Sequence, residues 1–423
     1  MLLGQSEDFN LPQHERESCA LATGEHDIPT VGGYRVKITG IKTYMSNCSR
    51  DGGVARRRGA ERRGSSFKTW LFLKVETDSD IFGWGEGSGE WLSPLVQKTL
   101  HEWEPLLVGR DPTDIGVLWE DVQSRFPWKG GPVFGSAVAA IDMALHDITG
   151  KAWGVPVYKL LGGRRRDRIK VYDGGISFGG TPDEAQAAAR AAIERGSRGL
   201  KGNPLEGRSW PMDGQELDRS AEIFHAVREE VGDSIELMLD CHGSPTPELA
   251  IAFAGLVAAS KPLFLEEPCK VGSIEALAQI SQRSPVPIAT GEKLFTLRQF
   301  RELIDRRACA FLQPDVAHCF GITGLMHIAH AASEEQMLMA PHGGIGPIVL
   351  SAYMHADAAM ENFLIQERST AWQAGCFDDL VDHDWVLADG HIGLSDRPGL
   401  GIDIREEAVA QMPYDEAMAF RQY

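Results

Sequence analysis

Residues 235–243 read Ile-Glu-Leu-Met-Leu-Asp-Cys-His-Gly, an apolar run that turns polar at Asp240. This pattern is typical of a buried strand that ends at a cavity. Five later apolar segments end in the same way, at Glu266, Glu292, Asp315, His342 and Glu367. The six residues are separated by steps of 26, 26, 23, 27 and 25 residues. The chain therefore repeats one structural unit, and each repeat ends a strand with an ionisable residue.

A step of about 25 residues accommodates one strand, one helix and two short loops, and such alternation predicts a parallel sheet. Eight units of this kind form a (β/α)8-type barrel, that is, a TIM barrel or a modification of it. Strand ends converge at the C-terminal face of a barrel, so polar residues that recur there indicate catalysis. The alternative is an open doubly wound sheet whose acidic residues cap helices, but six consecutive ionisable ends exceed what capping requires.

The sequence divides into four predicted parts. Residues 1–33 are a polar extension without periodicity, and residues 34–165 are expected to form an α+β capping domain. The barrel is predicted over residues 166–384, and the loop-rich segment 385–423 is expected to pack on the capping domain and complete it. Within the capping domain, patterning predicts strands at 34–44, 69–77 and 82–87 and helices at 94–107, 111–124 and 135–149, the second opened by Asp111-Pro112 as cap and first turn.

The composition excludes several classes of protein. Sixty acidic residues against 42 basic ones leave a formal charge of −18, which repels nucleic acid and anionic membranes. The seven cysteines are irregularly spaced and fit neither a disulfide framework nor a zinc site. The start of the chain lacks a signal-peptide pattern, and no run of 18 apolar residues occurs. We therefore expect a soluble, cytoplasmic protein with a small-molecule substrate, and we also expect it to form a homo-oligomer.

Three of the strand-end carboxylates are candidate metal ligands. Asp240, Glu266 and Glu292 are oxygen donors on successive strands, which suits a hard divalent cation and favours Mg²⁺ over zinc. Glu267 competes with Glu266 for this role and otherwise supports the site from behind it. A magnesium ion bound to a substrate carboxylate would stabilise the enediolate that forms when the α-proton leaves.

Two histidines are candidate catalysts. His342 follows Asp315 on the neighbouring strand, an arrangement in which the carboxylate orients the imidazole and makes it a stronger base. His242 lies two residues past Asp240, so strand alternation would point its side chain into the same cavity, where it is the candidate acid. A hydrogen-bonded structural role for either histidine, and a metal-ligand role for His242, are the alternatives.

Further residues are candidates for contacts with the substrate. Lys201 and Asn203 share one side of their strand and could hold a carboxylate or hydroxyl groups, with Glu367 beside them if it is protonated or paired with Lys201. Residues 46–66 contain six arginines against two acids, and they are either a solvated loop or a lid that meets an anionic substrate. Residues 126–132, which include Lys129, are a second candidate lid.

These motifs resemble the enolase superfamily, and its mandelate racemase subgroup most closely. The segment 140–151, followed by Leu160-Leu161-Gly162-Gly163, resembles the family's junction between capping domain and barrel, with His146 where Trp is usual. The order and spacing of five motifs are similar to those of the galactonate dehydratases: Asp240-x-His242-Gly243, Glu266-Glu267-Pro268, Gly291-Glu292, Gln313-Pro314-Asp315 and Ala340-Pro341-His342.

The resemblance implies a Mg²⁺-dependent acid-sugar dehydratase, a hydro-lyase. Such an enzyme removes the proton α to a carboxylate and eliminates the 3-hydroxyl, giving a 2-keto-3-deoxy acid. Members with Lys-x-Lys on the second barrel strand use the second lysine as a base, whereas this chain has Lys201-Gly202-Asn203, which disfavours a two-base racemase. The chain departs from the family in its arginine-rich loop, in its long N-terminus, and in Lys129, where an arginine is expected for substrate binding.

Two rival functions remain open at this point. The same acid and base could epimerise or racemise an acid sugar. Outside the enzymes, the barrel could be a metal-binding sensor or a structural protein, although neither needs His342 paired with Asp315.

Overall fold

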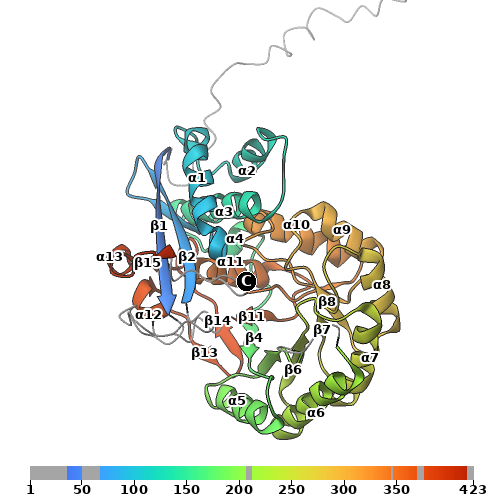
Figure 1. The fold of residues 1–423 in the computed structure, drawn as a ribbon. Coiled ribbons are helices and arrows are strands. Elements are labelled where there is room, and N and C mark those ends of the chain that lie inside the picture. Colours follow the sequence, from blue (N-terminus) through green and yellow to red (C-terminus); the bar gives the residue numbers. More distant parts are fainter. Residues whose placement is uncertain (1–35, 50–66, 206–211, 344–345, 369–375, 417–423) are drawn as a thin grey trace, which may run out of the picture. The chain divides into compact units, whose positions relative to one another are not determined.

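The described part of the chain begins with a three-stranded antiparallel meander of β1 (Ile38–Ser49), β2 (Phe67–Thr77) and β3 (Phe82–Glu86) (Figure 1). The computed structural model describes residues 36–49, 67–205, 212–343, 346–368 and 376–416, so the N-terminal extension and residues 50–66 of the arginine-rich loop lie outside it. The α1 helix (Ser93–Leu107), α2 (Ile115–Ser124) and α3 (Pro132–Trp153) pack against the meander through a shared apolar core. Together they make the α+β arrangement that patterning predicts.

The start of α2 differs from the prediction. The helix begins at Ile115, not at Asp111-Pro112. The Asp111 carboxylate instead accepts hydrogen bonds from the backbone N–H and the hydroxyl of Thr113, at 2.9 and 2.7 Å. Aspartate readily forms such local turns, which compete with helix initiation.

A closed parallel barrel follows the capping helices and the short α4 (Val157–Leu160). Consecutive strands pair in parallel from the first to the seventh, and the eighth pairs in parallel with the first. A bridge between Met339 and Phe363 joins the seventh strand to the segment that leads into the eighth. An open sheet is therefore excluded. The strands are β4 (Arg168–Ile176), β5 (Gly199–Gly202), β6 (Glu236–Asp240), β7 (Leu265–Glu266), β8 (Ile288–Thr290), β9 (Phe311–Leu312), β10 (Leu338–Met339) and β11 (Gln366–Arg368).

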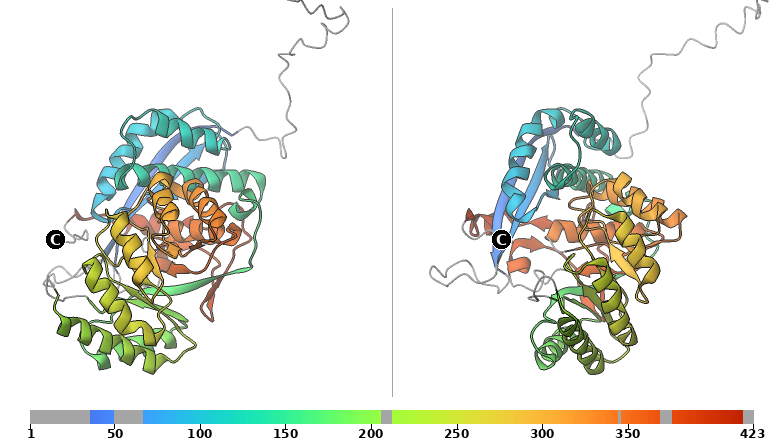
Figure 2. Two further views of the ribbon diagram at one scale, coloured as in Figure 1. Left: turned by 90° about the vertical axis from the view of Figure 1, so that its right-hand side faces the viewer. Right: turned by 45° about the vertical axis from the view of Figure 1, so that its right-hand side comes forward.

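One full helix follows each of the first seven barrel strands, and these helices lie outside the strands (Figure 2). In the described residues, β11 is followed first by the five-residue α12 (Cys376–Leu380) and by no full helix, so the barrel is a modified one. The seven helices are α5 (Pro182–Glu194), α6 (Gly214–Val231), α7 (Pro247–Val257), α8 (Ile274–Arg283), α9 (Leu297–Asp305), α10 (Gly321–Glu334) and α11 (Pro347–Ala359). None of the described helices is both long and apolar enough to cross a bilayer.

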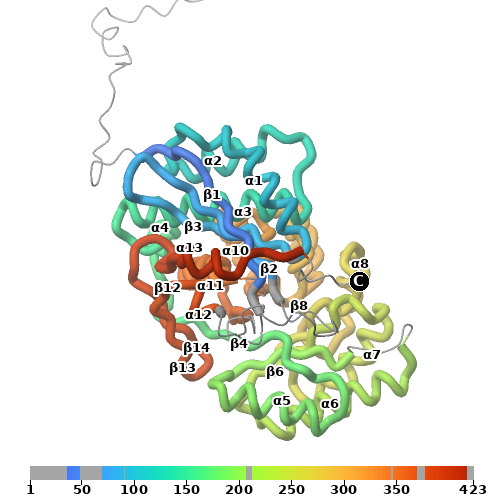
Figure 3. The backbone as a smooth tube through the Cα atoms, turned by 60° about the vertical axis from the view of Figure 1, so that its left-hand side comes forward, coloured from blue at the N-terminus to red at the C-terminus, as the bar shows by residue number. Residues whose placement is uncertain are grey.

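The C-terminal segment contacts the barrel as well as the capping sheet. In the hairpin of β13 (Leu387–Ala388) and β14 (His391–Gly393), β14 pairs antiparallel with β4. Further on, β15 (Asp403–Ile404) pairs with β12 (Val381–Asp382), and α13 (Glu406–Ala410) follows. Glu406 accepts hydrogen bonds from Tyr44 and Lys74 of the capping sheet, and Figure 3 shows α13 beside β1 and β2. The C-terminal segment thus makes the predicted contact with the capping domain and an additional contact with the barrel strand β4.

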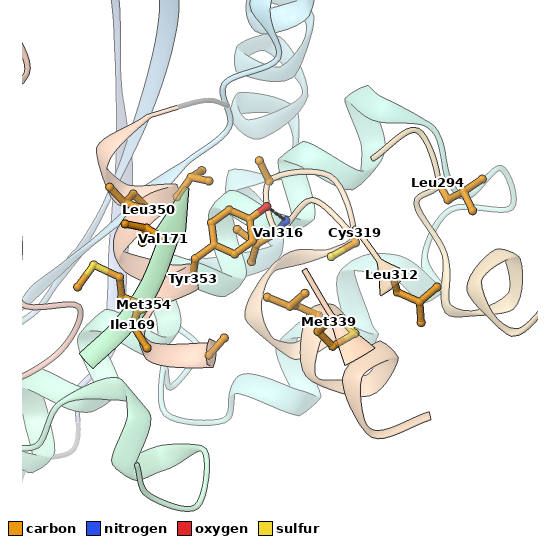
Figure 4. Close-up of a cluster of buried hydrophobic side chains, with 14 of the residues drawn as sticks. Ile169, Val171, Leu294, Leu312, Val316, Cys319, Met339, Leu350, Tyr353 and Met354 are labelled. Carbon is orange, nitrogen blue, oxygen red and sulfur yellow. Dashed lines mark hydrogen bonds between the residues drawn. The ribbon is translucent and has the colours of Figure 1, made fainter. Parts of the chain in front are cut away.

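Buried apolar side chains join the barrel wall to its helices (Figure 4). Tyr353 of α11 lies among Ile169, Val171 and Met354, and its hydroxyl accepts a hydrogen bond from the Val316 N–H at 2.8 Å. Because Val316 directly follows Asp315, this part of the core holds the loop at the end of β9.

His355, also on α11, makes stability depend on pH. Its Nδ1 accepts a hydrogen bond from the Tyr158 N–H at 3.3 Å, and its Nε2 lies 3.1 Å from the Leu400 carbonyl oxygen, so the neutral ring is fully bonded. Burial lowers its pKa from 6.5 to about 4. The unfolded chain therefore binds the extra proton first, and stability is lost as pH falls from 6.5 to about 4, by about 3 kcal/mol for this group.

We expect His355→Gln to lack this loss. The measurement is the difference in unfolding free energy between wild type and variant, determined by denaturant titration at pH 7 and pH 4. The exposed His330→Gln on the neighbouring α10 is the matched control, with no change expected. A difference for His355→Gln that does not vary with pH would contradict the prediction.

Candidate active site

Seven of the ionisable residues singled out from the sequence gather at the C-terminal ends of seven consecutive barrel strands. One lies inside β5, one ends β6 and one ends β7; those after β8, β9 and β10 follow within three residues of the strand, and one lies in β11. In that order they are Lys201, Asp240, Glu266, Glu292, Asp315, His342 and Glu367. Parallel pairing brings these ends to one mouth of the barrel.

Lys201 lies at the centre of a buried ionic cluster. Its Nζ is 2.6 Å from Glu266 Oε1, 3.1 Å from Glu367 Oε1 and 3.4 Å from Asp240 Oδ2. Burial alone would lower the pKa of Lys201, but Glu266 and Glu367 outweigh it and raise that pKa well above its usual value. Of the two states considered for Glu367, the structure has the one paired with Lys201. The ammonium group thus faces protein carboxylates instead of an open substrate position.

The three proposed metal ligands lie at the ends of adjacent strands, with Asp240 directly opposite Glu266 in the β6–β7 register and Glu292 two residues past β8. Gln313 donates to Glu266 Oε2 at 2.7 Å and holds the carboxylate in place. Burial and the charge of Asp240 raise the pKa of Glu266 well above its usual value, even with Lys201 beside it. The cluster is therefore short of positive charge.

Within the described ranges, no group of three or more His, Cys, Asp or Glu side chains is gathered closely enough to hold a metal ion as it stands. The physical reason is the position of Lys201, whose ammonium already bridges Asp240 and Glu266. The donor chemistry nevertheless fits a hard cation, because carboxylate oxygens from the ends of neighbouring strands gather at one mouth, and Lys201 supplies one positive charge against Asp240, Glu266 and Glu367.

His342 and Asp315 form a tight dyad. His342 Nδ1 lies 2.6 Å from Asp315 Oδ2, and its Nε2 lies 3.3 Å from Glu292 Oε2. Asp315 is held in turn by the Ala317 N–H at 2.8 Å and the Tyr353 hydroxyl at 3.1 Å. Burial opposes protonation of the ring, but Glu292 and then Asp315 raise the pKa of His342 to about 10. The dyad leaves Nε2 as the ring atom that faces the metal-ligand side of the mouth.

His242 reaches the same mouth from another direction. Its Nε2 lies 3.0 Å from Asp240 Oδ2, its Nδ1 lies 3.3 Å from Asn203 Nδ2, and the hydrogen bond to Asp240 raises its pKa. The prediction that strand alternation orients His242 was wrong. His242 lies in a turn with φ of 48°, held by its N–H to Asp240 Oδ1 at 2.9 Å, so strand alternation does not set its direction. With 60% of the side chain exposed, its ring borders solvent.

Glu267 faces away from Lys201. Its backbone has a φ of 45°, and its carboxylate pairs with Lys293 and accepts from the Thr290 hydroxyl at 3.4 Å. Lys293 also lies 2.9 Å from Glu292 Oε1 and so connects Glu267 to a proposed metal ligand. Sequence reasoning gave neither Lys293 nor Gln313 a role. Gln313 lies in the Gln313-Pro314-Asp315 motif, two residues before Asp315. This position at the end of a barrel strand could have indicated that its side chain reaches the site.

Lys129 is not joined to the cluster. It is exposed in the connection between α2 and α3, and its side chain forms no hydrogen bond or ion pair with the residues that the structure describes. The neighbouring Gly130 lies beside the loop after β8, since a Cβ added there would be 3.7 Å from the Thr296 methyl group. The second candidate lid therefore borders the barrel mouth.

Comparisons with known proteins agree with this geometry. Residues 62–162 match the family model of the mandelate racemase/muconate lactonizing enzyme N-terminal domain, and residues 183–408 match the enolase C-terminal domain-like model. A D-galactonate dehydratase from Pectobacterium atrosepticum is 36% identical over 347 residues, covering 81% of this chain and 90% of the relative.

Two solved structures extend the likeness to the fold. A mandelate racemase/muconate lactonizing enzyme-like protein from Rubrobacter xylanophilus superposes with a TM-score of 0.79 at 28% identity, over 90% of this chain and 98% of that one. An enolase from Pantoea ananatis with bound D-gluconate and magnesium superposes with a TM-score of 0.77 at 28% identity, over 90% and 95%.

Proposed function

Because the chain belongs to the mandelate racemase/muconate lactonizing enzyme family of the enolase superfamily, we propose that it is an acid-sugar dehydratase. It removes the proton α to the carboxylate of an aldonic acid and eliminates the 3-hydroxyl, which gives a 2-keto-3-deoxy acid. One observation carries the proposal: His242 follows β6 and His342 follows β10, four strands apart in an eight-stranded ring. An acid and a base are thereby placed on opposite sides of one mouth.

The resident cofactor we propose is Mg²⁺, with Asp240, Glu266 and Glu292 as its protein ligands. When bound, it would withdraw electron density from the substrate carboxylate and lower the free energy of the enediolate. The related Pantoea ananatis structure contains magnesium together with an aldonic acid, which supports this choice.

His342 acts as the base in this scheme. Its Nδ1 is hydrogen-bonded to Asp315, so Nε2 accepts the α-proton, and the C–H electron pair moves into the enediolate. Glu292 is the first of the charges that raise the pKa of His342. If Glu292 ligated a cation, its negative charge would be offset. The pKa of His342 would then fall toward the range in which its ring accepts a proton near neutral pH.

His242 acts as the acid. Its bond to Asp240 favours the protonated ring, and its exposed position lets it reach a hydroxyl of a substrate in the mouth. As the C–O bond breaks, His242 gives its proton to the leaving hydroxyl, and water departs. The enol that remains tautomerises to the 2-keto-3-deoxy acid. Asn203, Lys129 and the Lys201–Glu367 pair are proposed to shape the position of the substrate.

The direct experiment is a screen of acid sugars with Mg²⁺, beginning with D-galactonate because of the name of the 36% identical relative. A 2-keto-3-deoxy product, detected by its semicarbazone absorbance, is the expected result. Parallel incubation in ²H₂O separates the rival enzyme, since an epimerase or racemase exchanges the α-proton without forming keto acid. If no acid sugar in the library gives keto acid or exchange, the proposal is wrong.

His242→Asn separates the acid from the base. We expect this variant to exchange the α-proton with solvent while dehydration falls by about 10²- to 10⁴-fold, the loss typical of a positioned acid. The measurement pairs NMR detection of deuterium incorporation with keto-acid formation. His391→Asn is the control and should behave as wild type, because His391 in β14 pairs with Lys170 near the start of β4, at the end of the barrel away from the mouth. Wild-type dehydration by His242→Asn would remove the residue from the mechanism.

We also propose a reducing, cytoplasmic setting and a homo-oligomer. Four described cysteines, at positions 241, 269, 309 and 319, are buried and free. Leu95, Val117 and Trp153 are large apolar side chains on the capping helices that remain more than half exposed, and contacts with a second subunit would cover them. Sedimentation velocity tests the oligomer.

A further inference from the structure

The capping domain grips the barrel beside both members of the histidine–aspartate dyad. After Asp315, the Ser136 hydroxyl of α3 lies 2.8 Å from His318 Nδ1. After His342, Glu86 of β3 contacts the start of α11. The capping domain thus contacts the chain shortly after Asp315 and again shortly after His342.

Glu86 is fully buried and bonded on both oxygens. Its Oε2 accepts hydrogen bonds from the N–H groups of Ile348 and Val349, at 3.1 and 3.2 Å, and its Oε1 accepts from the Ser88 hydroxyl at 2.6 Å. The first N–H groups of a helix have no partner within the helix and need an outside acceptor. Glu86 therefore caps α11 from a different domain.

The sequence at the start of α11 is built for such a distant cap. The N-cap position is Gly346, which has no side chain to cap the helix, and Pro347 lacks an N–H. A Cβ added at Gly346 would lie 2.1 Å from Glu86 Oε1, so a larger residue would collide with the carboxylate. Glycine at this position fits Glu86 and gives up the local cap.

The α11 helix connects Glu86 to the dyad. All thirteen of its residues are buried, and Tyr353 within it donates to Asp315 Oδ1 at 3.1 Å. Asp315 in turn lies 2.6 Å from His342 Nδ1. A shift at the start of this helix would move the tyrosine that orients the aspartate.

We propose that Glu86 is a positioning residue for the proposed base: it anchors the N-terminus of α11, so that Tyr353 keeps Asp315 against His342. The inference rests on the proposed function, because it assigns Glu86 a part in that reaction. Burial, with a contribution from the nearby Asp315, raises the pKa of Glu86 to about 7, which agrees with an electrostatic environment shared with the dyad.

Two substitutions separate the acceptor from the volume of the side chain. Glu86→Gln retains an oxygen that can accept from Ile348 and Val349, whereas Glu86→Leu fills similar space with no acceptor. We expect Glu86→Gln to keep kcat within about threefold, and Glu86→Leu to lower kcat roughly 10- to 100-fold with KM within about twofold, as for a misplaced catalytic group. If Glu86→Leu does not fold, Glu86→Asp takes its place. This variant keeps the charge but withdraws it by one methylene from the N–H groups of α11, and we expect the same loss of kcat.

Asp147→Asn is the matched control. Asp147 is also a buried carboxylate of the capping domain that accepts backbone N–H groups, from Trp84 at 2.9 Å and from Leu400 at 2.8 Å, but it does not hold a dyad loop. We expect it to lower thermal stability while kcat stays within about threefold. Equal losses of kcat in Asp147→Asn and Glu86→Leu would overturn the proposal, since a general loss of stability would then explain both.

Hydrogen–deuterium exchange of the peptide covering residues 346–354 supplies a readout that needs no substrate. Glu86→Leu should exchange faster there than wild type or Asp147→Asn, and unchanged exchange in all variants would overturn the positioning role. Failure of the proposed function looks different, because the wild-type enzyme itself would then give no keto acid from any acid sugar.

Discussion

His342→Asn is expected to lose both dehydration and α-proton exchange. The asparagine side chain occupies a similar position, but it cannot accept the proton that Nε2 takes, so both processes lose their common first step. Removal of a positioned base costs on the order of 10²- to 10⁴-fold in rate. The two rates are measured together, as keto acid formed in H₂O and as deuterium gained in ²H₂O.

The exposed His330→Asn on α10 is the control for this substitution and should retain both rates. Asp315→Asn supplies a second check, since it preserves shape but removes the charge at 2.6 Å from Nδ1. We expect it to lower both rates in parallel. Exchange at the wild-type rate in His342→Asn would show that another group removes the α-proton.

Glu292→Gln is expected to abolish the response to Mg²⁺. The substitution is nearly isosteric but removes one negative charge and leaves the proposed magnesium site with two carboxylates. A ligand at 100 times its Kd stabilises the folded state by about 2.7 kcal/mol, which raises the Tm. In Glu292→Gln, the rise in Tm on adding Mg²⁺ should disappear together with turnover. Differential scanning fluorimetry across a MgCl₂ titration measures the first effect, and keto-acid formation measures the second.

Glu267→Gln is the matched control for the metal site. Glu267 neighbours the same cluster, but it pairs with Lys293 and bonds Thr290, so its loss should weaken the site without removing the response to Mg²⁺. Full activity of Glu292→Gln, or of the wild type in excess chelator, would contradict the ligand assignment.

Much of the fold could be read from spacing. The five steps from Asp240 to Glu367 match the length of a strand, a helix and two loops, because backbone geometry allows few other ways to use about 25 residues in a parallel repeat. The spacing also predicts the location of the site, since the ends of parallel strands must meet at one face of a barrel. Period and chemistry together therefore predict both the barrel and most of the residues at its mouth.

Contacts made by turns and by other domains are not carried by any period. His242 reaches Asp240 from a turn with positive φ, and Lys293 joins Glu267 to Glu292 through a bend after β8. Gln313 holds Glu266 across two strands. Such contacts depend on where a side chain ends in space, and sequence patterns report only which face of an element it starts from.

The sequence by itself determined the repeating strand ends, the barrel they form and the chemical character of its mouth. The tertiary structure alone decided that Lys201 faces carboxylates and that Glu86, 256 residues before His342, caps the helix that orients the base. The physical reason is range. Periodicity is set by the local geometry of the backbone, whereas the state of a buried charge and the cap of a helix are set by whichever groups folding brings within hydrogen-bonding distance.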